Sequence, residues 1–384
     1  MAWKTDWTVK VNGVDLSDEM RPLLTSITVI DKAEDSADSC SLEFDWQADN
    51  LRMPRKGSLV EVLLDQVPVF TGVVDKVTSK GGRSSGRVLS VSAKGFDAAG
   101  KAKEPQLFHM DDATIGDFME ELGRRAGFEV KVDPAFADIV REYQLADGES
   151  FFHVGQRLAR ELGGTFKPRG NKAILAKRGI DHGLPKIEGR FGGQTAAQGN
   201  LISWNISPIT ARPAFSKVAV RYFDRDAAEI KTVEADVERA DERTNAVNLV
   251  RSMAEDKQQA ETIADARKRE SDRDEGEGQV VLDLYPEAQS EAQFTLSGTC
   301  PGVDGVYRIA SAKHHATRSG GAITTLTLKQ PEGGAGKDDR KSPDGSAGAT
   351  TSGTTSSATT DNAAVTGGGS GELPTLDQPG DGPE

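Results

Sequence analysis

The chain has 384 residues, a formal net charge of −13, 36% hydrophobic residues and two cysteines. At roughly 100 to 200 residues per domain, this length predicts two to four domains whose cores need no disulfides, which excludes a small disulfide-stapled scaffold. The acidic charge disfavours specific or sequence-independent binding of nucleic acid, and the lack of a run of roughly 20 apolar residues argues against stable membrane insertion.

Residues 1–103 show the pattern of a first β-rich domain. In Ser39–Trp46 apolar residues alternate with polar ones, which is the period-two pattern of a strand with one buried face. Further strand-like segments, separated by turn residues, are Leu59–Leu64, Val69–Val77 and Arg87–Ala93. Several short strands at this spacing predict a barrel or a sandwich.

Residues 104–180 change to a helical period and predict an α/β insert. Thr114–Ala126 and Ser150–Leu162 each place their apolar residues on one helical face, begin at a hydroxyl residue and end before a glycine. The two segments align without a gap at a spacing of 36 residues. We therefore expect two helix–strand units, each made of a capped helix, a glycine stop and a strand.

Residues 181–332 return to strand patterns and predict a second β-barrel domain. One interruption, residues 248–273, is rich in Ala, Glu, Lys and Gln and predicts an embedded surface helix. Residues 333–384 are dominated by Gly, Ser, Thr, Ala and Asp, so burial cannot offset the entropy of ordering them. We expect an acidic, disordered C-terminal tail, long enough to reach a partner.

The sequence contains no signature of an enzyme active site. There is no G-x-x-x-x-G-K-[ST], G-x-S-x-G or H-E-x-x-H motif. His314 and His315 are adjacent on a predicted strand, so they face opposite ways and cannot chelate one ion together. Cys40 and Cys300 lie one in each half, which predicts free thiols in a reducing compartment. We expect no catalytic residue, no cofactor and no metal.

Six segments together resemble a known family. They are DSADSCSLEFDW (35–46), RKGSLVEVLL (55–64), VFTGVVDKVTS (69–79), SAKGFDAAGKAK (92–103), GESFFHVGQRLARELGGTF (148–166) and FTLSGTCPGVDGVYRIASAKHHATRSGGAITTLTLKQ (294–330). In this order they resemble the late control D proteins, the baseplate hub proteins of contractile, Mu-like phage tails, related in fold to the first part of the VgrG spikes. Phe151 departs from the family pattern, which usually has an acidic residue there.

The resemblance implies an α+β, mainly β fold in which two tube-like β-barrel domains flank an α/β insert. It implies a homotrimeric structural protein whose six barrels match a hexameric tail tube, whose threefold base meets the spike, and whose central channel stays open. The implied partners are the tail tube protein, a separate spike protein and the tape-measure protein. The implied location is the virion tail baseplate, with assembly in the bacterial host cytoplasm.

We expect subunit contacts at the N-terminal aromatics and at edge strands in Ser39–Trp46 or Ile323–Leu328, because open sheets gain by covering their edges. The candidate interface residues are Trp3, Trp7, Cys40, Leu42, Phe44, Trp46, Leu326 and Leu328.

Other functions stay open at this point. A cell-wall-degrading tail hub enzyme would use a carboxylate of the insert, for which Glu149 and Glu161 are the candidates, although His153 beside them fits a solvated helix face. A type VI secretion spike-related protein is a second alternative. A carbohydrate- or peptide-binding module built on residues 104–180 is a third.

Overall fold

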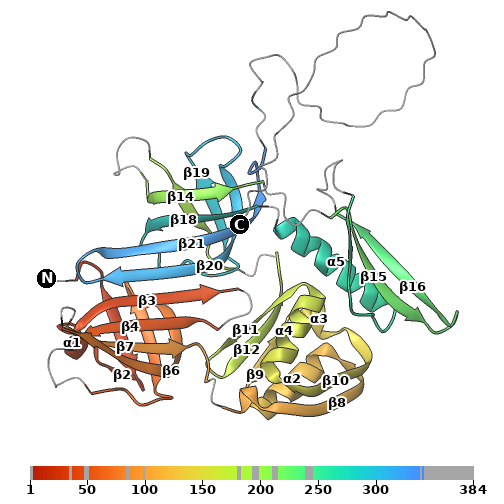
Figure 1. Cartoon of the computed structure of the whole chain (residues 1–384), viewed down its shortest axis with the longest axis horizontal. Helices are drawn as coiled ribbons and strands as arrows, with labels where there is room; N and C mark the ends of the chain where they lie inside the picture. Colours follow the sequence, from red (N-terminus) through yellow and green to blue (C-terminus); the bar gives the residue numbers. More distant parts are fainter. Residues whose placement is uncertain are drawn as a thin grey trace, which may run out of the picture. The chain divides into compact units, whose positions relative to one another are not determined.

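In the computed structural model the described residues are 3–33, 37–46, 52–83, 86–97, 100–179, 183–192, 199–209, 215–237, 245–274, 276–337 and 340. Residues Met1–Asp339 form one compact unit (Figure 1). This unit is built mainly from strands with few helices, which confirms the predicted α+β, mainly β class. None of the described helices is long and apolar enough to cross a bilayer.

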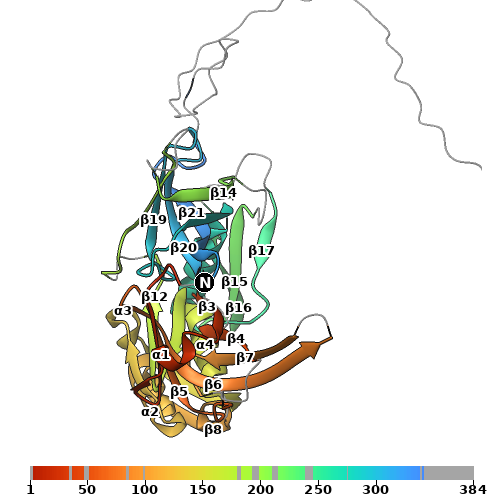
Figure 2. The ribbon, with the colours of Figure 1, turned by 90° about the vertical axis from the view of Figure 1, so that its left-hand side faces the viewer.

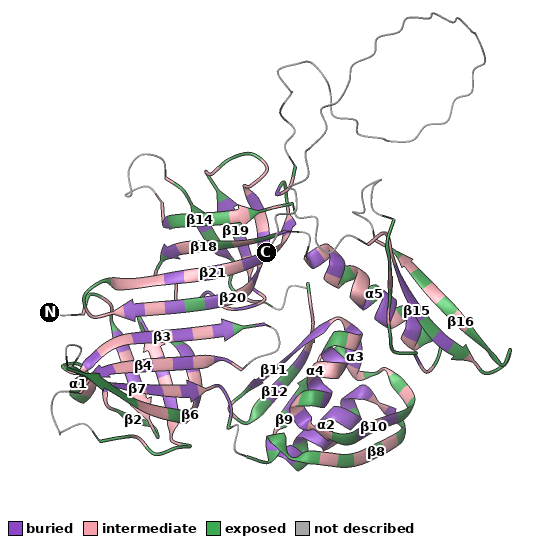
Figure 3. Ribbon diagram, viewed as in Figure 1, coloured by how far each residue is buried: buried purple, intermediate pink, exposed green. Residues whose placement is uncertain are grey.

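The N-terminal half is a sheet around its own core. Its strands are β1 (Trp7–Val11), β2 (Val14–Asp15), β3 (Leu24–Lys32), β4 (Ser39–Asp45), β5 (Leu59–Leu64), β6 (Val67–Gly82) and β7 (Gly86–Lys94), with the short helix α1 (Ser17–Met20). They pair in the order β1-β5-β6-β7-β4-β3. Buried and half-buried residues alternate along β4, as Figure 3 shows, and along β5, as the period-two pattern predicts.

The C-terminal half is a second sheet around a separate core. Its strands are β13 (Ile187–Arg190), β14 (Leu201–Ser207), β18 (Glu277–Asp283), β19 (Gln293–Ser297), β20 (Gly305–Thr317) and β21 (Gly321–Glu332). They pair in the order β13-β19-β20-β21-β18-β14, with β13 parallel to β19. Because β20 also pairs with β3, the two halves share one continuous sheet while their hydrophobic cores remain distinct.

The two halves follow the same path. With the short β2 left aside, each half has six described strands, and when these are numbered one to six along the chain, both halves pair them in the order 1-4-5-6-3-2. The strands β1, β3, β4, β5, β6 and β7 therefore correspond, in turn, to β13, β14, β18, β19, β20 and β21. The one difference in direction is at the first strand, which is antiparallel to its neighbour in the first half and parallel in the second.

The insert between the halves contains two strand–helix–strand units. Its elements are the turn η1 (Lys101–Lys103), β8 (Pro105–Thr114), α2 (Ile115–Ala126), β9 (Glu129–Val132), α3 (Pro134–Ala137), β10 (Val140–Ser150), α4 (Phe151–Leu162), β11 (Gly164–Arg169) and β12 (Lys172–Lys177). Both predicted helices are confirmed, with Thr114 and Ser150 as N-caps and Gly127 and Gly163 in the left-handed conformation at their ends. The helices share one core with β9, β11 and β12.

The contribution of the N-cap Thr114 to the stability of α2 can be measured directly. Thr114 Oγ1 accepts the Asp117 N–H at 3.0 Å and donates to the Asp117 carboxylate at 2.7 Å, whereas Ser150 Oγ accepts the His153 N–H at the longer distance of 3.3 Å. We expect Thr114→Ala to lower the free energy of unfolding by about 1 kcal/mol. Ser150→Ala should cost less, and chemical denaturation of the two variants measures the difference.

The predicted helix 248–273 is wrong at its start. Val247–Leu249 is instead strand β17, parallel to β15 (Lys217–Asp224), which also pairs with β16 (Glu229–Asp236). The helix α5 is Lys257–Arg273, because Asp256 caps it by accepting the Gln259 N–H at 2.7 Å. Figure 1 shows α5 against β15 and β16, and its buried residues Ala260, Ile263 and Ala264 share a core with these strands.

The predicted tail begins inside the folded unit. Ala335 is buried in the C-terminal core, and Gly336 N–H donates to the Gly302 carbonyl at 2.8 Å. Residues 338, 339 and 341–384 lie outside the described residues, so the prediction of disorder there is not tested.

Candidate functional site

The joint between the two halves is a ladder of paired strands. β3 and β20 pair from Lys32 with Ser311 to Ser26 with Thr317. Ile27 and Val29 of this stretch are fully buried. Such a ladder holds the two halves together through backbone hydrogen bonds as well as side chains.

Side chains and the β20–β21 turn lock this ladder in register. Thr28 Oγ1 lies 2.9 Å from His315 Nδ1, across the two strands. In the turn, the Arg318 backbone N–H donates to the Thr25 carbonyl at 3.0 Å, and its guanidinium donates to the Pro22 carbonyl at 2.7 Å.

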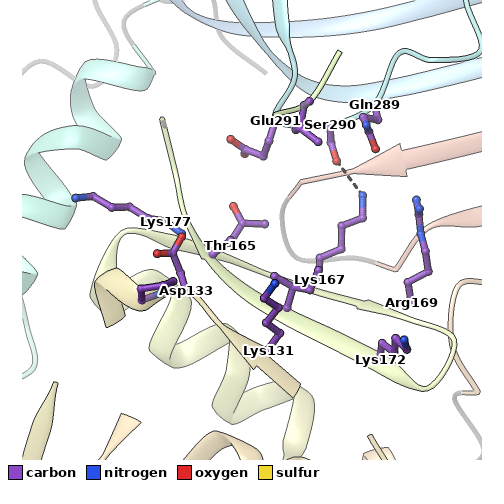
Figure 4. A pocket seen from close by; sticks show the side chains of 14 residues that line it. Lys131, Asp133, Thr165, Lys167, Arg169, Lys172, Lys177, Gln289, Ser290 and Glu291 are labelled. Atoms are coloured by element: carbon purple, nitrogen blue, oxygen red, sulfur yellow. Dashed lines mark hydrogen bonds between the residues drawn. The ribbon is translucent and has the colours of Figure 1, made fainter. Parts of the chain in front are cut away.

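A buried charge cluster ties the insert to both halves beside this joint. Lys167 of β11 forms an ion pair with Asp31 of β3. Lys167 also donates to Ser290 Oγ at 2.9 Å, as Figure 4 shows. Ser290 Oγ donates in turn to Asp31 at 2.6 Å. Arg169 and Lys167 also reach Asp38, at 3.2 and 3.4 Å.

The pKa values of the two carboxylates in this cluster shift in opposite directions. Burial acts to raise the pKa of Asp31, but the Lys167 ammonium and the hydrogen bonds from Lys167 and Ser290 outweigh it and hold that pKa below its usual value. Burial and the neighbouring Asp31 charge raise the pKa of Asp38 above its usual value, against the pull of Lys167 and Arg169. Lys167 is therefore the counter-charge on which Asp31 depends.

A cavity of about 500 Å³ lies beside the cluster, between the insert and the loop that carries Ser290 (Figure 4). Its charged lining is mostly basic, with Lys131, Lys167, Arg169, Lys172 and Lys177 facing two acids. Its described lining has no histidine or cysteine, and Lys167 beside Ser290 is an ammonium that donates to Ser290 Oγ and is paired with Asp31, so it is not placed to act as a base. In the described part of the chain, no group of three His, Cys, Asp or Glu side chains is placed to hold a metal ion.

Glu149 and Glu161, the candidate carboxylates of a cell-wall-degrading enzyme, form ion pairs between a strand and a helix. Glu149 accepts from Arg157 at 2.8 Å, and Glu161 accepts from Arg141 at 2.5 Å. Because β10 carries Glu149 and Arg141 while α4 carries Arg157 and Glu161, these pairs fix the helix to the strand. The exposed His153 lies 3.5 Å from Glu149, on the solvated helix face that the sequence indicates.

The two adjacent histidines face opposite ways, as predicted. His314 is buried and lies 3.1 Å from both Thr324 Oγ1 and the Ala288 carbonyl, and burial lowers its pKa. His315 faces Thr28 in the joint. Among the described residues, neither histidine belongs to a group of three His, Cys, Asp or Glu side chains that could hold a metal ion.

Most of the predicted interface side chains fill cores within this chain. The buried ones are Trp7, Cys40, Leu42 and Phe44 in the first half and Leu326 and Leu328 in the second. Trp3 and Trp46 are half-buried against the first core, and Trp3 packs edge-on against Trp7 at 5.3 Å between ring centroids. Their contact with another subunit stays a prediction.

The expectation that these strands form sheet edges is wrong. β4 pairs with β3 and β7, and β21 pairs with β20 and β18, so both lie inside the sheet. Among the described residues β14 is an edge strand of the second half, and its Ile202 and Trp204 are 53% and 37% exposed. Its alternation of apolar and polar residues was a readable strand signal, but the pattern does not tell an edge strand from an interior one.

A family model and solved structures both relate this chain to phage tail proteins. A family model described as phage tail baseplate hub (GPD) matches residues 50–320. A search of curated proteins found no match.

Solved structures of similar fold are tail and secretion proteins. The prophage MuSo2 43 kDa tail protein from Shewanella oneidensis has a TM-score of 0.66 at 14% identity, covering 85% of this chain and 98% of its own. A tail protein from Neisseria meningitidis MC58 has a TM-score of 0.66 at 15% identity, covering 85% and 96%. The E. coli c3393 protein, a type VI secretion component, has a TM-score of 0.52 at 11% identity, covering 86% and 78%.

Proposed function

Because this chain belongs to the phage tail baseplate hub family, we propose that it assembles as a homotrimer whose six β-rich halves form a ring between tail tube and spike. The family gives the coarser statement directly: this is a structural protein of the tail hub, located in the virion tail baseplate. Three chains with two like halves each present six similar units to a sixfold tube, while the trimer keeps the threefold symmetry of a spike.

The observation that carries this proposal is the repeated strand order of the two halves. Two unrelated folds in one chain would give a trimer no way to imitate a ring of six.

The proposed partners are the tail tube protein, a separate spike protein and the tape-measure protein in the channel, with assembly in the bacterial host cytoplasm. In this scheme the protein acts by matching symmetries and performs no chemistry, which agrees with the ion-paired state of Glu149 and Glu161.

The oligomer can be tested with the purified full chain. We expect light scattering to give three times the mass of the 41.0 kDa chain, and electron micrographs to show a threefold ring with a central hole. A particle that stays monomeric at all concentrations and has no affinity for the tube or spike proteins contradicts the proposal.

A further inference from the structure

The two halves correspond residue by residue, because their pairing registers coincide. The hairpin β6–β7 pairs Val74 with Ala93 and Gly82 with Gly86, and the hairpin β20–β21 pairs Ile309 with Leu328 and Thr317 with Gly321. Every residue number in the second set is 235 higher than its counterpart in the first. Both hairpins have a bulge at the same place, Asp75 in one and Ala310 in the other, and β20–β21 has a further register shift between Val306 and Arg308.

The strands β3 and β14 correspond in the same way. Leu24 pairs opposite Phe44 of β4, and Leu201 pairs opposite Leu282 of β18. Each ladder then skips one residue and continues, from Ser26 in β3 and from Ser203 in β14, at a constant difference of 177. The position of Ile27 in the first half is therefore held by Trp204 in the second.

One of these corresponding edges is used within the chain and the other is not. The outer edge of β3 carries the ladder to residues 311–317 of β20. The outer edge of β14, and the edge of β6 at residues 76–82 that faces away from β7, pair with no strand among the described residues. Figure 2 shows this end of the β6–β7 hairpin projecting away from the body.

We infer that β14 of one copy pairs antiparallel with the projecting part of β6 in the next copy, repeating between chains the joint that β3 and β20 make within one. This inference rests on the proposed ring and names its subunit contact. The register follows from the internal joint, in which Thr317 pairs with Ser26, His315 with Thr28 and Lys313 with Ile30. The corresponding pairs between copies are Gly82 with Ser203, Lys80 with Asn205 and Thr78 with Ser207. Pro208, which has no N–H to donate, ends the ladder there.

The side chains at the open edge fit a contact between copies. Ile27 and Val29 of the paired strand are fully buried in the first core, whereas their counterparts Trp204 and Ile206 are exposed and half-buried, respectively. Ile209, just beyond, is 66% exposed. An apolar, unpaired strand edge is a template for another strand, so this surface needs a partner.

The turn that locks the internal joint has a counterpart as well. Arg318 donates from its backbone to Thr25 and from its side chain to Pro22. The residue at the corresponding place in the β6–β7 turn is Arg83, since the same difference of 235 separates them. In the contact between copies, Arg83 would meet residues 199–202, at the start of β14.

The contact is heterologous, because β14 and β6 are different surfaces of the same chain. Such contacts propagate head to tail and close into a ring when the rotation per step allows it. Internal and intermolecular joints of the same geometry would alternate around that ring. Three chains supply the six halves of the proposed assembly.

A disulfide across the predicted register tests the contact. Because Thr28 and His315 touch across the internal joint, their counterparts Asn205 and Lys80 should face each other closely. In a Cys300→Ser background, which removes the exposed native thiol, we expect Lys80→Cys with Asn205→Cys to oxidise into covalent trimers on a denaturing gel without reductant. The matched control, Lys80→Cys with Ser207→Cys, lies two residues out of register and should cross-link at least several-fold less, since diagonal neighbours exceed the reach of a disulfide.

A second variant measures the same edge without cysteines. Trp204→Glu places a charge where the ladder would bury an indole, so we expect at least a tenfold rise in the concentration at which trimers form. Tyr143→Glu is the control, since Tyr143 is similarly exposed, at 49%, but lies on β10 of the insert.

The outcomes separate this contact from the ring itself. Trimers that form in Trp204→Glu as in the original chain, together with equal cross-linking of the two cysteine pairs, overturn the β14–β6 contact and leave the trimeric hub standing. A monomer that forms neither trimer nor cross-link overturns both.

Discussion

Replacing Lys167 with methionine is expected to lower the free energy of unfolding by about 3 kcal/mol at neutral pH, because it leaves a buried carboxylate without its counter-charge. The Asp31 side chain is 6% exposed and has Lys167 as its ion-pair partner. Methionine keeps the apolar stem of the lysine, so the change in the free energy of unfolding reports the removal of the ammonium charge and not a loss of packing. Chemical denaturation of the variant and the original chain measures it.

The effect should depend on pH in a definite direction. Because the folded pKa of Asp31 is below its usual value of 3.8, its ionised form adds stability above that pH, and the contribution is lost as pH falls through the folded pKa. The raised pKa of Asp38 acts with the opposite sign, since its contribution is present at low pH and is lost as pH rises. The difference between Lys167→Met and the original chain should therefore be largest near pH 7 and shrink below about pH 4.

The control is a lysine of the same cavity wall whose ion pair is exposed. Lys172 and Glu129 approach to 3.6 Å with side chains 68% and 73% exposed. Lys172→Met should change the free energy of unfolding by less than about 1 kcal/mol. Equal losses for the two variants would mean that Lys167 acts through general charge rather than through the buried cluster.

Local signals in the sequence were enough to predict much of the fold. The caps Thr114 and Ser150, each followed by apolar residues at helical spacing and then by a glycine, define two helices almost to the residue. Alternation in Ser39–Trp46 predicted a strand with one buried face. These signals are local because capping, turn and amphipathic preferences act over a few residues.

What the sequence did not reveal depends on contacts between distant residues. Thr28 and His315 meet across 287 positions, and nothing near either residue identifies the other. The same holds for edges: Leu42 in an interior strand and Trp204 in an edge strand both lie in alternating patterns, but only the pairing of whole strands decides which is covered.

The embedded helix shows how composition misleads. The Ala, Glu, Lys and Gln that predicted the helix lie mostly in Lys257–Arg273, whereas residues 248–256 include Leu249, Val250 and Met253, and Val247–Leu249 pairs with β15. Asp256 was the better signal for the helix start, because a capping residue marks a boundary that composition does not.

A methyl group at Gly72 is expected to destabilise the N-terminal half by about 3 kcal/mol, the upper end of the usual cost of overpacking. A Cβ there would lie 2.0 Å from the Lys94 carbonyl oxygen of β7 and 2.6 Å from the Phe70 ring. The carbonyl belongs to backbone, so Gly72→Ala must shift one strand against its neighbour and disturb the base of the β6–β7 hairpin. The hairpin that would reach the next copy therefore depends on a residue without a side chain.

Tryptophan fluorescence gives a readout confined mostly to this half, because Trp3, Trp7 and Trp46 pack on the first core. Gly57→Ala is the control, since a Cβ at Gly57 meets nothing within 4 Å and carries only the strain of its positive φ of 82°. That strain costs about 1 to 2 kcal/mol. If Gly72→Ala unfolds at the same denaturant concentration as the control, β6 and β7 are packed less tightly at Lys94 than in the structure. The close contact at Gly72 would then not be what holds the base of the hairpin.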